Sequence, residues 1–148
     1  MNANRRAFLD MLAASEGTAG KGDNGYNVIV GGTLFNGYSD HPRILVDLPK
    51  LGIKSSAAGR YQLLARYFDA YKKQLKLPDF SPQSQDIIAL QQIKEQKALD
   101  DVDAGNLAAA VDKCKNIWAS LPCAGYKQRE HNLVFLQDAY VKAGGVLV

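Results

Sequence analysis

The sequence changes character at Gly17. Before this glycine, Phe8 and Leu12 lie four residues apart, and Glu16 continues the same helical series. After it, residues 18–37 are rich in glycine and in turn-forming residues. A glycine often follows the last turn of a helix because it adopts the left-handed conformation at low cost. The sequence therefore predicts a short first helix that ends at Gly17 and an irregular or β-rich segment after it.

Glu16 is an unusual residue for the end of such a helix. The C-terminus of a helix carries partial negative charge, which disfavours an anion. The apolar neighbours Phe8 and Leu12 would also remove water from the carboxylate, and both effects raise its pKa. A carboxyl group that stays protonated near neutral pH can act as a general acid. The alternative is a solvated glutamate that ends the helix and has no chemical role.

The segment after Gly17 contains one clear hairpin pattern. The β-prone runs at residues 26–30 and 33–35 are separated by Gly31 and Gly32, which is typical of a β-hairpin. Residues 44–56 have weak patterning and include Pro49 and Gly52. We therefore predict a long loop there, of the kind that often closes over a binding site as a lid.

From residue 57 onward the sequence is helical in character, with apolar stripes and recognisable caps. The predicted helices begin at the cap Asn4, after a cap at Ser55 or Ser56, at Pro82, near Leu99, at the cap Asn106 and near Glu130. The apolar side of the third helix is expected to carry Ile87, Ile88, Leu90 and Ile93. Several helices with one small antiparallel hairpin near the N-terminus amount to an α+β fold.

A chain of 148 residues with 47% hydrophobic content can bury a core as one domain. We expect a β-rich lobe at about residues 18–58 and a helical lobe from the remainder. The net charge of +3 is not concentrated in any run, so it argues against a nucleic-acid-binding protein. With no signal-peptide or membrane-spanning run, synthesis and folding in a reducing cytoplasm are expected, without stable membrane association.

The cysteines and histidines do not suggest a metal or redox site. Cys114 lies on an apolar helical stripe and is expected in the core, whereas Cys123 lies in a loop. A disulfide or a shared metal between them is disfavoured in a reducing compartment. His41 and His131 are not at ligand spacing from any partner, so no metal or other cofactor is expected.

Six blocks of sequence, in order and over nearly the whole chain, match one known pattern. They are residues 7–18, 25–32, 38–43, 59–64, 89–94 and 116–122. These blocks resemble the lambda-type phage endolysins. The resemblance implies a lysozyme-like fold with a cleft between two lobes, and a lytic transglycosylase that cleaves the β-1,4 bond between N-acetylmuramic acid and N-acetylglucosamine in peptidoglycan. It also implies that Glu16 is catalytic. The chain departs from the pattern in three places: a shorter segment between Thr18 and Tyr26, Cys123 in place of the family's glycine, and a shorter C-terminal tail.

A lytic transglycosylase needs only one carboxyl group. Glu16 would protonate the glycosidic oxygen and then accept the proton of the muramic acid C6 hydroxyl as this attacks C1 of its own ring, which leaves a 1,6-anhydro end. A hydrolytic muramidase needs a second carboxylate, for which Asp23 and Asp40 are the candidates. Both lie in turn sequences where aspartate usually has a structural role. A non-catalytic wall-binding module is a third possibility, which the semi-buried position expected for Glu16 argues against.

The predicted sugar-binding residues are Gln62, Gln91, Tyr26, Tyr126 and Ser39. Lysozyme-like transglycosylases often have a sugar-contacting glutamine in a turn like residues 59–62. Gln62 is expected here at the start of a helix, where it would either contact the sugar or be a surface residue. The Gln91 amide could point into the cleft or bond to backbone as a buried group. Tyr26 and Tyr126 could stack on sugar rings or simply pack, and Tyr61 is expected in the core.

The resemblance also implies how the protein works in the host. Its partners are the glycan strands of peptidoglycan, and a monomer is expected. Because the chain carries no export signal, it is expected in the host cytoplasm and to reach the periplasm through a separate holin that it does not bind.

Overall fold

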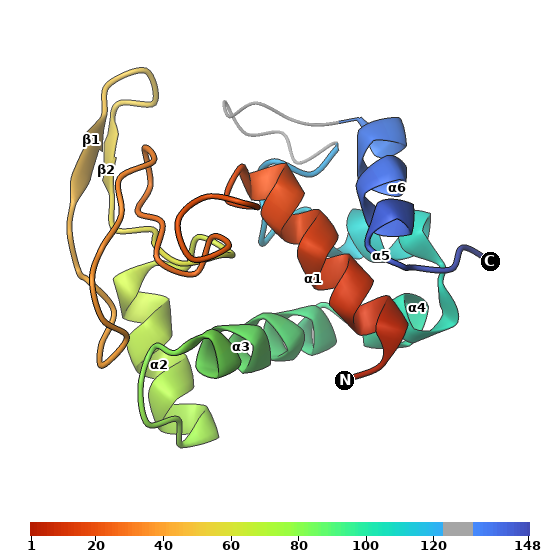
Figure 1. Cartoon of the computed structure of the whole chain (residues 1–148), viewed down its shortest axis with the longest axis horizontal. Helices are drawn as coiled ribbons and strands as arrows, with labels where there is room; N and C mark the ends of the chain where they lie inside the picture. Colours follow the sequence, from red (N-terminus) through yellow and green to blue (C-terminus); the bar gives the residue numbers. More distant parts are fainter. Residues whose placement is uncertain (123–131) are drawn as a thin grey trace. The chain divides into compact units, whose positions relative to one another are not determined.

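The computed structural model of the chain describes residues 1–122 and 132–148. It is mostly helical with one small antiparallel sheet, which confirms the α+β prediction (Figure 1). The elements in chain order are α1 (Ala3–Glu16), β1 (Val46–Leu48), β2 (Ile53–Ser55), α2 (Ala65–Leu75), α3 (Pro82–Glu95), α4 (Leu99–Ala104), α5 (Leu107–Cys114) and α6 (Leu133–Lys142). No helix in this described part is both long and apolar enough to span a bilayer.

The chain forms two compact units. The first, called here the helical unit, consists of Met1–Gly17 and Ala89–Val148. The second, called the hairpin unit, is Thr18–Ile88 and contains β1, β2 and α2. The boundary between the units falls within α3.

Helix α1 is the centre of the helical unit. It packs against α4 and α6, and α4 packs against α5 (Figure 1). Its fully buried side chains are Ala7, Phe8, Leu9, Met11, Leu12 and Ala13. A helix buried around so much of its circumference is held firmly by its surroundings. Glu16 therefore projects from the end of a well-anchored element.

The two ends of α1 differ in how well the sequence predicted them. Gly17 ends the helix in the left-handed conformation at φ +78°, and its N–H bonds back into the last turn, as expected. At the other end, the prediction of Asn4 as the cap is wrong by two residues. The cap is Asn2, whose side chain accepts a hydrogen bond from the Arg5 N–H at 2.8 Å. The Asn4 side chain instead accepts a bond from the N–H of Val146 at 3.0 Å.

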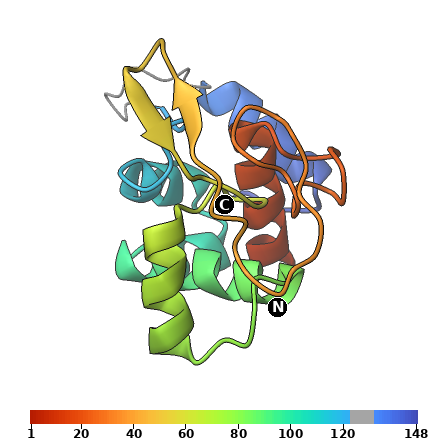
Figure 2. The same ribbon diagram turned by 90° about the vertical axis from the view of Figure 1, so that its left-hand side faces the viewer.

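The regular sheet lies in the segment predicted to be a loop. Strands β1 and β2 pair in antiparallel register, with Val46 opposite Ser55 and Leu48 opposite Ile53 (Figure 2). Each strand has three residues, and Ser55 is the only fully buried one among the six. Strands this short and this exposed produce no clear alternation of apolar and polar residues. The loop prediction for residues 44–56 is therefore wrong, for a reason that the sequence could not reveal.

The hairpin predicted at residues 26–35 is only partly formed. The chain does reverse direction at Gly31 and Gly32, whose φ angles are +93° and +103°. Val28 and Leu34 form a single isolated bridge rather than two paired strands. The turn is closed by backbone hydrogen bonds such as that from the Ile29 N–H to the Thr33 carbonyl at 2.7 Å, and the opposite edge of residues 28–30 bonds to residues 57–59. The predicted hairpin is therefore present but too short to form two regular strands.

Helix α2 begins eight residues later than predicted. Residues 57–64 form a tight turn in which Ala58 and Leu63 exchange two backbone hydrogen bonds. The N-cap is Leu64, which makes no side-chain capping bond, so the prediction of Ser55 or Ser56 as the cap is wrong. The Ser56 Oγ does accept a bond from the Ala65 N–H at 2.9 Å across that turn. The sequence does not indicate the intervening turn, which moves the start of the helix.

The remaining helices follow the prediction more closely. Helix α3 begins at Pro82 as expected, although Ile87 is 45% exposed and only Ile88 and Ile93 of the expected apolar side are fully buried. Helix α5 ends at Cys114, which is buried as expected, rather than near Leu121. Helix α6 begins after its cap Asn132. The start expected near Glu130 lies outside the described residues.

The core of the hairpin unit is aromatic and includes a histidine. The rings of Phe68 and Phe80 lie 5.0 Å apart, and His41 packs against both. The Nδ1 atom of His41 accepts a bond from the Arg43 N–H at 2.9 Å, which leaves Nε2–H to donate to the Leu63 carbonyl at 2.8 Å. Burial lowers the pKa of this imidazole, which is consistent with a neutral ring. His41 is thus a structural residue.

Candidate active site

The last residue of α1, Glu16, has an environment that suits an acid. Its side chain is half-buried, and the last turn of α1 has no basic residue to offset the partial charge of the helix end. Burial raises the pKa of Glu16 from 4.5 to about 7, against the smaller opposing effect of a hydrogen bond from Ser120. A carboxyl group with this pKa is partly protonated at neutral pH and can give or take a proton.

Two buried serines form a hydrogen-bonded chain that ends on this carboxyl group. The hydroxyl of Ser120 donates to Oε2 of Glu16 at 2.5 Å, and the hydroxyls of Ser15 and Ser120 lie 2.6 Å apart. Because Ser120 has only one hydroxyl hydrogen and Glu16 receives it, Ser15 must donate to Ser120. With Oε2 occupied as an acceptor, the transferable proton of Glu16 is placed on Oε1.

The sequence did not reveal this serine pair. Ser15 and Ser120 are 105 residues apart, and the only signal that Ser120 carries in the sequence is its place in block 116–122, which resembles a known family. The chain reaches this position because it turns after Cys114 instead of continuing α5, and Trp118 and Leu121 are both buried there. Only the tertiary fold brings the hydroxyl to the carboxyl group.

Gln62 is held by its own backbone surroundings. Its Nε2 donates to the carbonyls of Gly59 at 2.9 Å and of Val28 at 3.3 Å, which uses both amide hydrogens. The residue lies in the turn before α2, with φ +56°, rather than at the start of a helix as predicted. A non-glycine residue in the left-handed region is uncommon, and such residues concentrate at functional sites. Its remaining polar atom, Oε1, is the one that could accept a bond from a sugar hydroxyl.

Tyr26 lies in a packed polar cluster. Its hydroxyl donates to Oδ1 of Asp86 at 2.9 Å, its ring meets Tyr61 edge to face, and the Arg60 guanidinium lies over it at 5.3 Å. These contacts favour packing over sugar stacking, the two roles that the sequence had left open. Tyr61 is buried, as expected.

The other predicted sugar-binding residues lie in simpler surroundings. Gln91 donates from its amide to Oε2 of Glu95, one turn along α3, at 3.2 Å, and the fully buried amide at this point of the helix is that of Gln92. Ser39 is exposed in the hairpin unit. Tyr126 lies outside the described residues. Glu16 and Gln91 thus belong to the helical unit, and Gln62, Tyr26 and Ser39 to the hairpin unit.

Both candidate second carboxylates have structural partners. Asp23 accepts a bond from the hydroxyl of Tyr38 at 2.6 Å. Asp40 forms an ion pair with Arg43 at 2.9 Å, and this contact holds the pKa of Asp40 below its usual value. Both carboxylates are thus engaged in structural contacts within the hairpin unit.

The described residues contain no cluster of three or more side chains suited to a metal ion. Cys114 is a free, buried thiol whose pKa burial raises to about 12, so it is a weak nucleophile. Cys123 and His131 lie outside the described residues.

Comparisons with known proteins agree over the whole chain. A model of the Endolysin family matches residues 6–147. The endolysin of Escherichia phage lambda is 59% identical over 152 residues, which cover 99% of this chain and 95% of the relative. The endolysin of Escherichia phage P2 is 52% identical over 155 residues, which cover 97% of this chain and 94% of the relative.

Solved structures give the same result. Bacteriophage lambda lysozyme complexed with a chitohexasaccharide superposes with a TM-score of 0.96 at 56% identity, over 100% of this chain and 98% of the other. A second structure of the lysozyme from bacteriophage lambda gives a TM-score of 0.91 at 57% identity, with the same coverage.

Proposed function

This chain belongs to the endolysin family, and we propose that within it the chain is a lytic transglycosylase that cleaves peptidoglycan without consuming water. Membership of the family makes it a phage enzyme that degrades the bacterial cell wall. The proposed bond is the β-1,4 link between N-acetylmuramic acid and N-acetylglucosamine. The complex of lambda lysozyme with a chitohexasaccharide supports the binding of a similar sugar polymer by this chain.

The observation that carries the proposal is the raised pKa of Glu16 together with its hydrogen bond from Ser120. With Oε2 bonded to Ser120, the proton on Oε1 is the one available to the glycosidic oxygen. Its transfer breaks the bond between that oxygen and C1 of the muramic acid, and N-acetylglucosamine leaves as an alcohol. The C6 hydroxyl of the same muramic acid then attacks C1, and its proton goes to the Glu16 carboxylate. Atoms balance without water, and Glu16 is again protonated.

A pKa of about 7 suits both halves of this cycle. At neutral pH a comparable fraction of Glu16 is protonated and ionised, so the same group can serve as acid and then as base. Because the nucleophile belongs to the sugar that is cleaved, its effective concentration is very high and no water-activating base is required.

A hydrolytic muramidase of the same fold is the alternative, and it would need a second carboxylate to act as nucleophile or base. Asp23 would have to exchange its bond to Tyr38, and Asp40 its ion pair with Arg43, for such a role. These contacts favour the single-carboxylate mechanism. Gln62 has no acidic proton to give, so its proposed role is to contact the sugar through Oε1 rather than to react.

The proposed route of the protein in the cell follows from its substrate. Peptidoglycan lies in the periplasm, so we propose that the chain accumulates in the host cytoplasm and reaches the wall through a separate holin.

Digestion of purified Gram-negative peptidoglycan followed by mass spectrometry of the products tests the chemistry. A transglycosylase releases muramic acid ends that are lighter by one water than hydrolytic ends and that borohydride cannot reduce. Reducing ends as the main product would assign the chain to the hydrolases.

A further inference from the structure

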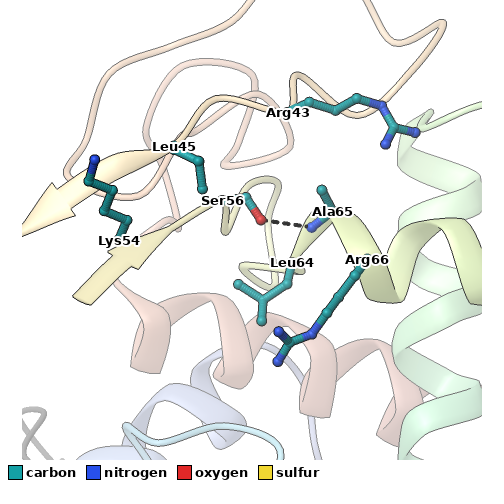
Figure 3. Close-up of a pocket in the computed structure, with 7 residues that line it drawn as sticks. All are labelled: Arg43, Leu45, Lys54, Ser56, Leu64, Ala65 and Arg66. Carbon is teal, nitrogen blue, oxygen red and sulfur yellow. Dashed lines mark hydrogen bonds between the residues drawn. The ribbon is translucent and has the colours of Figure 1, made fainter.

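The hairpin unit has a hollow whose lining includes none of the residues proposed to react or to bind sugar. Its volume is about 320 Å³, and it lies between the segment before β1, the end of β2 and the start of α2 (Figure 3). The side chains that define its character are Leu45, Lys54, Ser56, Leu64 and Arg66.

The hollow carries positive charge that no acid in the described part of the chain neutralises. Lys54 and Arg66 are both exposed, and neither forms an ion pair within residues 1–122 and 132–148. Asp47 is opposite Lys54 in the strand register but lies beyond ion-pair distance. Arg43, the third cation of the lining, contacts Asp40 and Asp69 at 2.9 and 2.6 Å, and Figure 3 shows its side chain directed away from Leu64. The unneutralised cations are therefore Lys54 and Arg66.

Arg66 is also at an unfavourable position in its helix. It lies in the first turn of α2, where the partial positive charge of the helix disfavours a cation, and this turn has no acidic residue. The guanidinium lies 4.9 Å from the ring centre of Tyr67, a contact that orients it without removing its charge. A bound anion would relieve the repulsion between Arg66 and the end of the helix.

A hydroxyl donor and two apolar side chains complete the lining. Ser56 Oγ accepts a bond from the Ala65 N–H, drawn as a dashed line in Figure 3, so its own hydrogen is left to donate. Leu45 is 66% exposed and Leu64 is partly buried, and both line the same hollow. The ligand that fits combines an anionic oxygen group with a small aliphatic part.

We propose that this hollow binds a carboxylate of the peptide stems that branch from the muramic acid residues of peptidoglycan. These stems carry several free carboxylates next to short aliphatic groups such as the methyl of D-alanine. Arg66 and Ser56 would bind the carboxylate, and Leu45 and Leu64 the aliphatic part. Lys54, whose side chain points away from Arg66 in Figure 3, would attract a second carboxylate of the same stem. This proposal rests on the proposed function only in taking peptidoglycan as the substrate, and it does not depend on how the glycan bond is broken.

The test is a titration of the ¹⁵N-labelled full chain, followed by amide chemical shifts in NMR spectra. The probe is the sugar-free tetrapeptide L-Ala-γ-D-Glu-meso-diaminopimelate-D-Ala. We expect shift changes at residues 43–66, and a dissociation constant raised roughly fivefold by Arg66→Gln and by Lys54→Gln, which is the size of an exposed charged contact. Lys73→Gln is the matched control, because it removes an exposed lysine from the other end of α2.

Three results would overturn the proposal. Equal weakening by all three variants would indicate only the general field of a basic protein. Unchanged binding of a tetrapeptide whose carboxylates are all converted to amides would show that no carboxylate is recognised. Binding of anionic phosphatidylglycerol vesicles, with the same dependence on Arg66 and with no response to the tetrapeptide, would assign the hollow to lipid. Because no turnover is measured, these results are independent of the product analysis that tests the proposed function.

Discussion

Replacing Glu16 with glutamine is expected to make the protein more stable while removing its activity. The folded protein raises the pKa of Glu16 from 4.5 to about 7, so it holds the proton at pH values where the unfolded chain has released it. This contribution to stability is fully present below about pH 4.5 and is lost as the pH rises to about 7. Above that pH, the folded protein carries a buried carboxylate, which is unfavourable.

The size of the effect follows from the shift. A rise from 4.5 to about 7 corresponds to about 3 kcal/mol of unfolding free energy, at about 1.4 kcal/mol per unit. Glutamine has a similar shape, stays neutral at all pH values and can still accept the bond from Ser120. Glu16→Gln should therefore match the parent protein below pH 4.5 and exceed its stability by about 3 kcal/mol at pH 8. For a chain of this length that is a rise in Tm of about 6–12 °C.

The assay is urea unfolding of both proteins, monitored by circular dichroism at several pH values between 4 and 8. Glu95→Gln is the control, because it neutralises an exposed glutamate and should give no comparable gain at pH 8. Stability curves of Glu16→Gln and the parent that run parallel from pH 4 to pH 8 would refute a raised pKa at Glu16, and with it the physical basis of its role as an acid.

Three further predictions follow from the same site and its surroundings. Glu16→Gln should lower the rate of turbidity loss of chloroform-treated Gram-negative cells by ~10²–10⁴, and a folded variant with near-parental activity would contradict the assignment of Glu16. Ser120→Ala should raise the pKa of Glu16 further, because the Ser120 hydroxyl lowers it; the alkaline limb of the pH–activity profile should then move to higher pH, and Ser120→Thr, which keeps a hydroxyl, should restore it. Amide hydrogen exchange at residues 44–56, which include β1 and β2, should slow when a chitooligosaccharide binds, whereas equal exchange at saturation would count against a lid.

The parts of the fold that depend on local signals were predictable from the sequence. Gly17 ends α1 because a left-handed residue is required there, and Pro82 starts α3 because its missing N–H is harmless at the first position of a helix. The unfavourable environment of Glu16 could likewise be inferred, since it depends on the helix end and on the neighbours in its own helix.

The parts that depend on distant contacts were not predictable. The carbonyl of Val28 bonds to the distant Gly59 on the edge opposite the local turn, and nothing in residues 26–35 indicates that pairing. Strands β1 and β2 were missed because three residues each, with at most one buried, carry too little pattern. The contact of Ser120 with Glu16 joins residues 104 positions apart, and a serine has no sequence signature for such a role.

Digestion of peptidoglycan in ¹⁸O-labelled water tests the central claim most directly. If the C6 hydroxyl of muramic acid is the only nucleophile, solvent contributes no atom to the product. The new muramic acid ends should then be unlabelled 1,6-anhydro sugars, and Asp23→Asn and Asp40→Asn should give the same product, although Asp40→Asn also loses an ion pair with Arg43. Reducing muramic acid ends that carry ¹⁸O, and that disappear when one of these aspartates is neutralised, would contradict the account and establish a two-carboxylate muramidase.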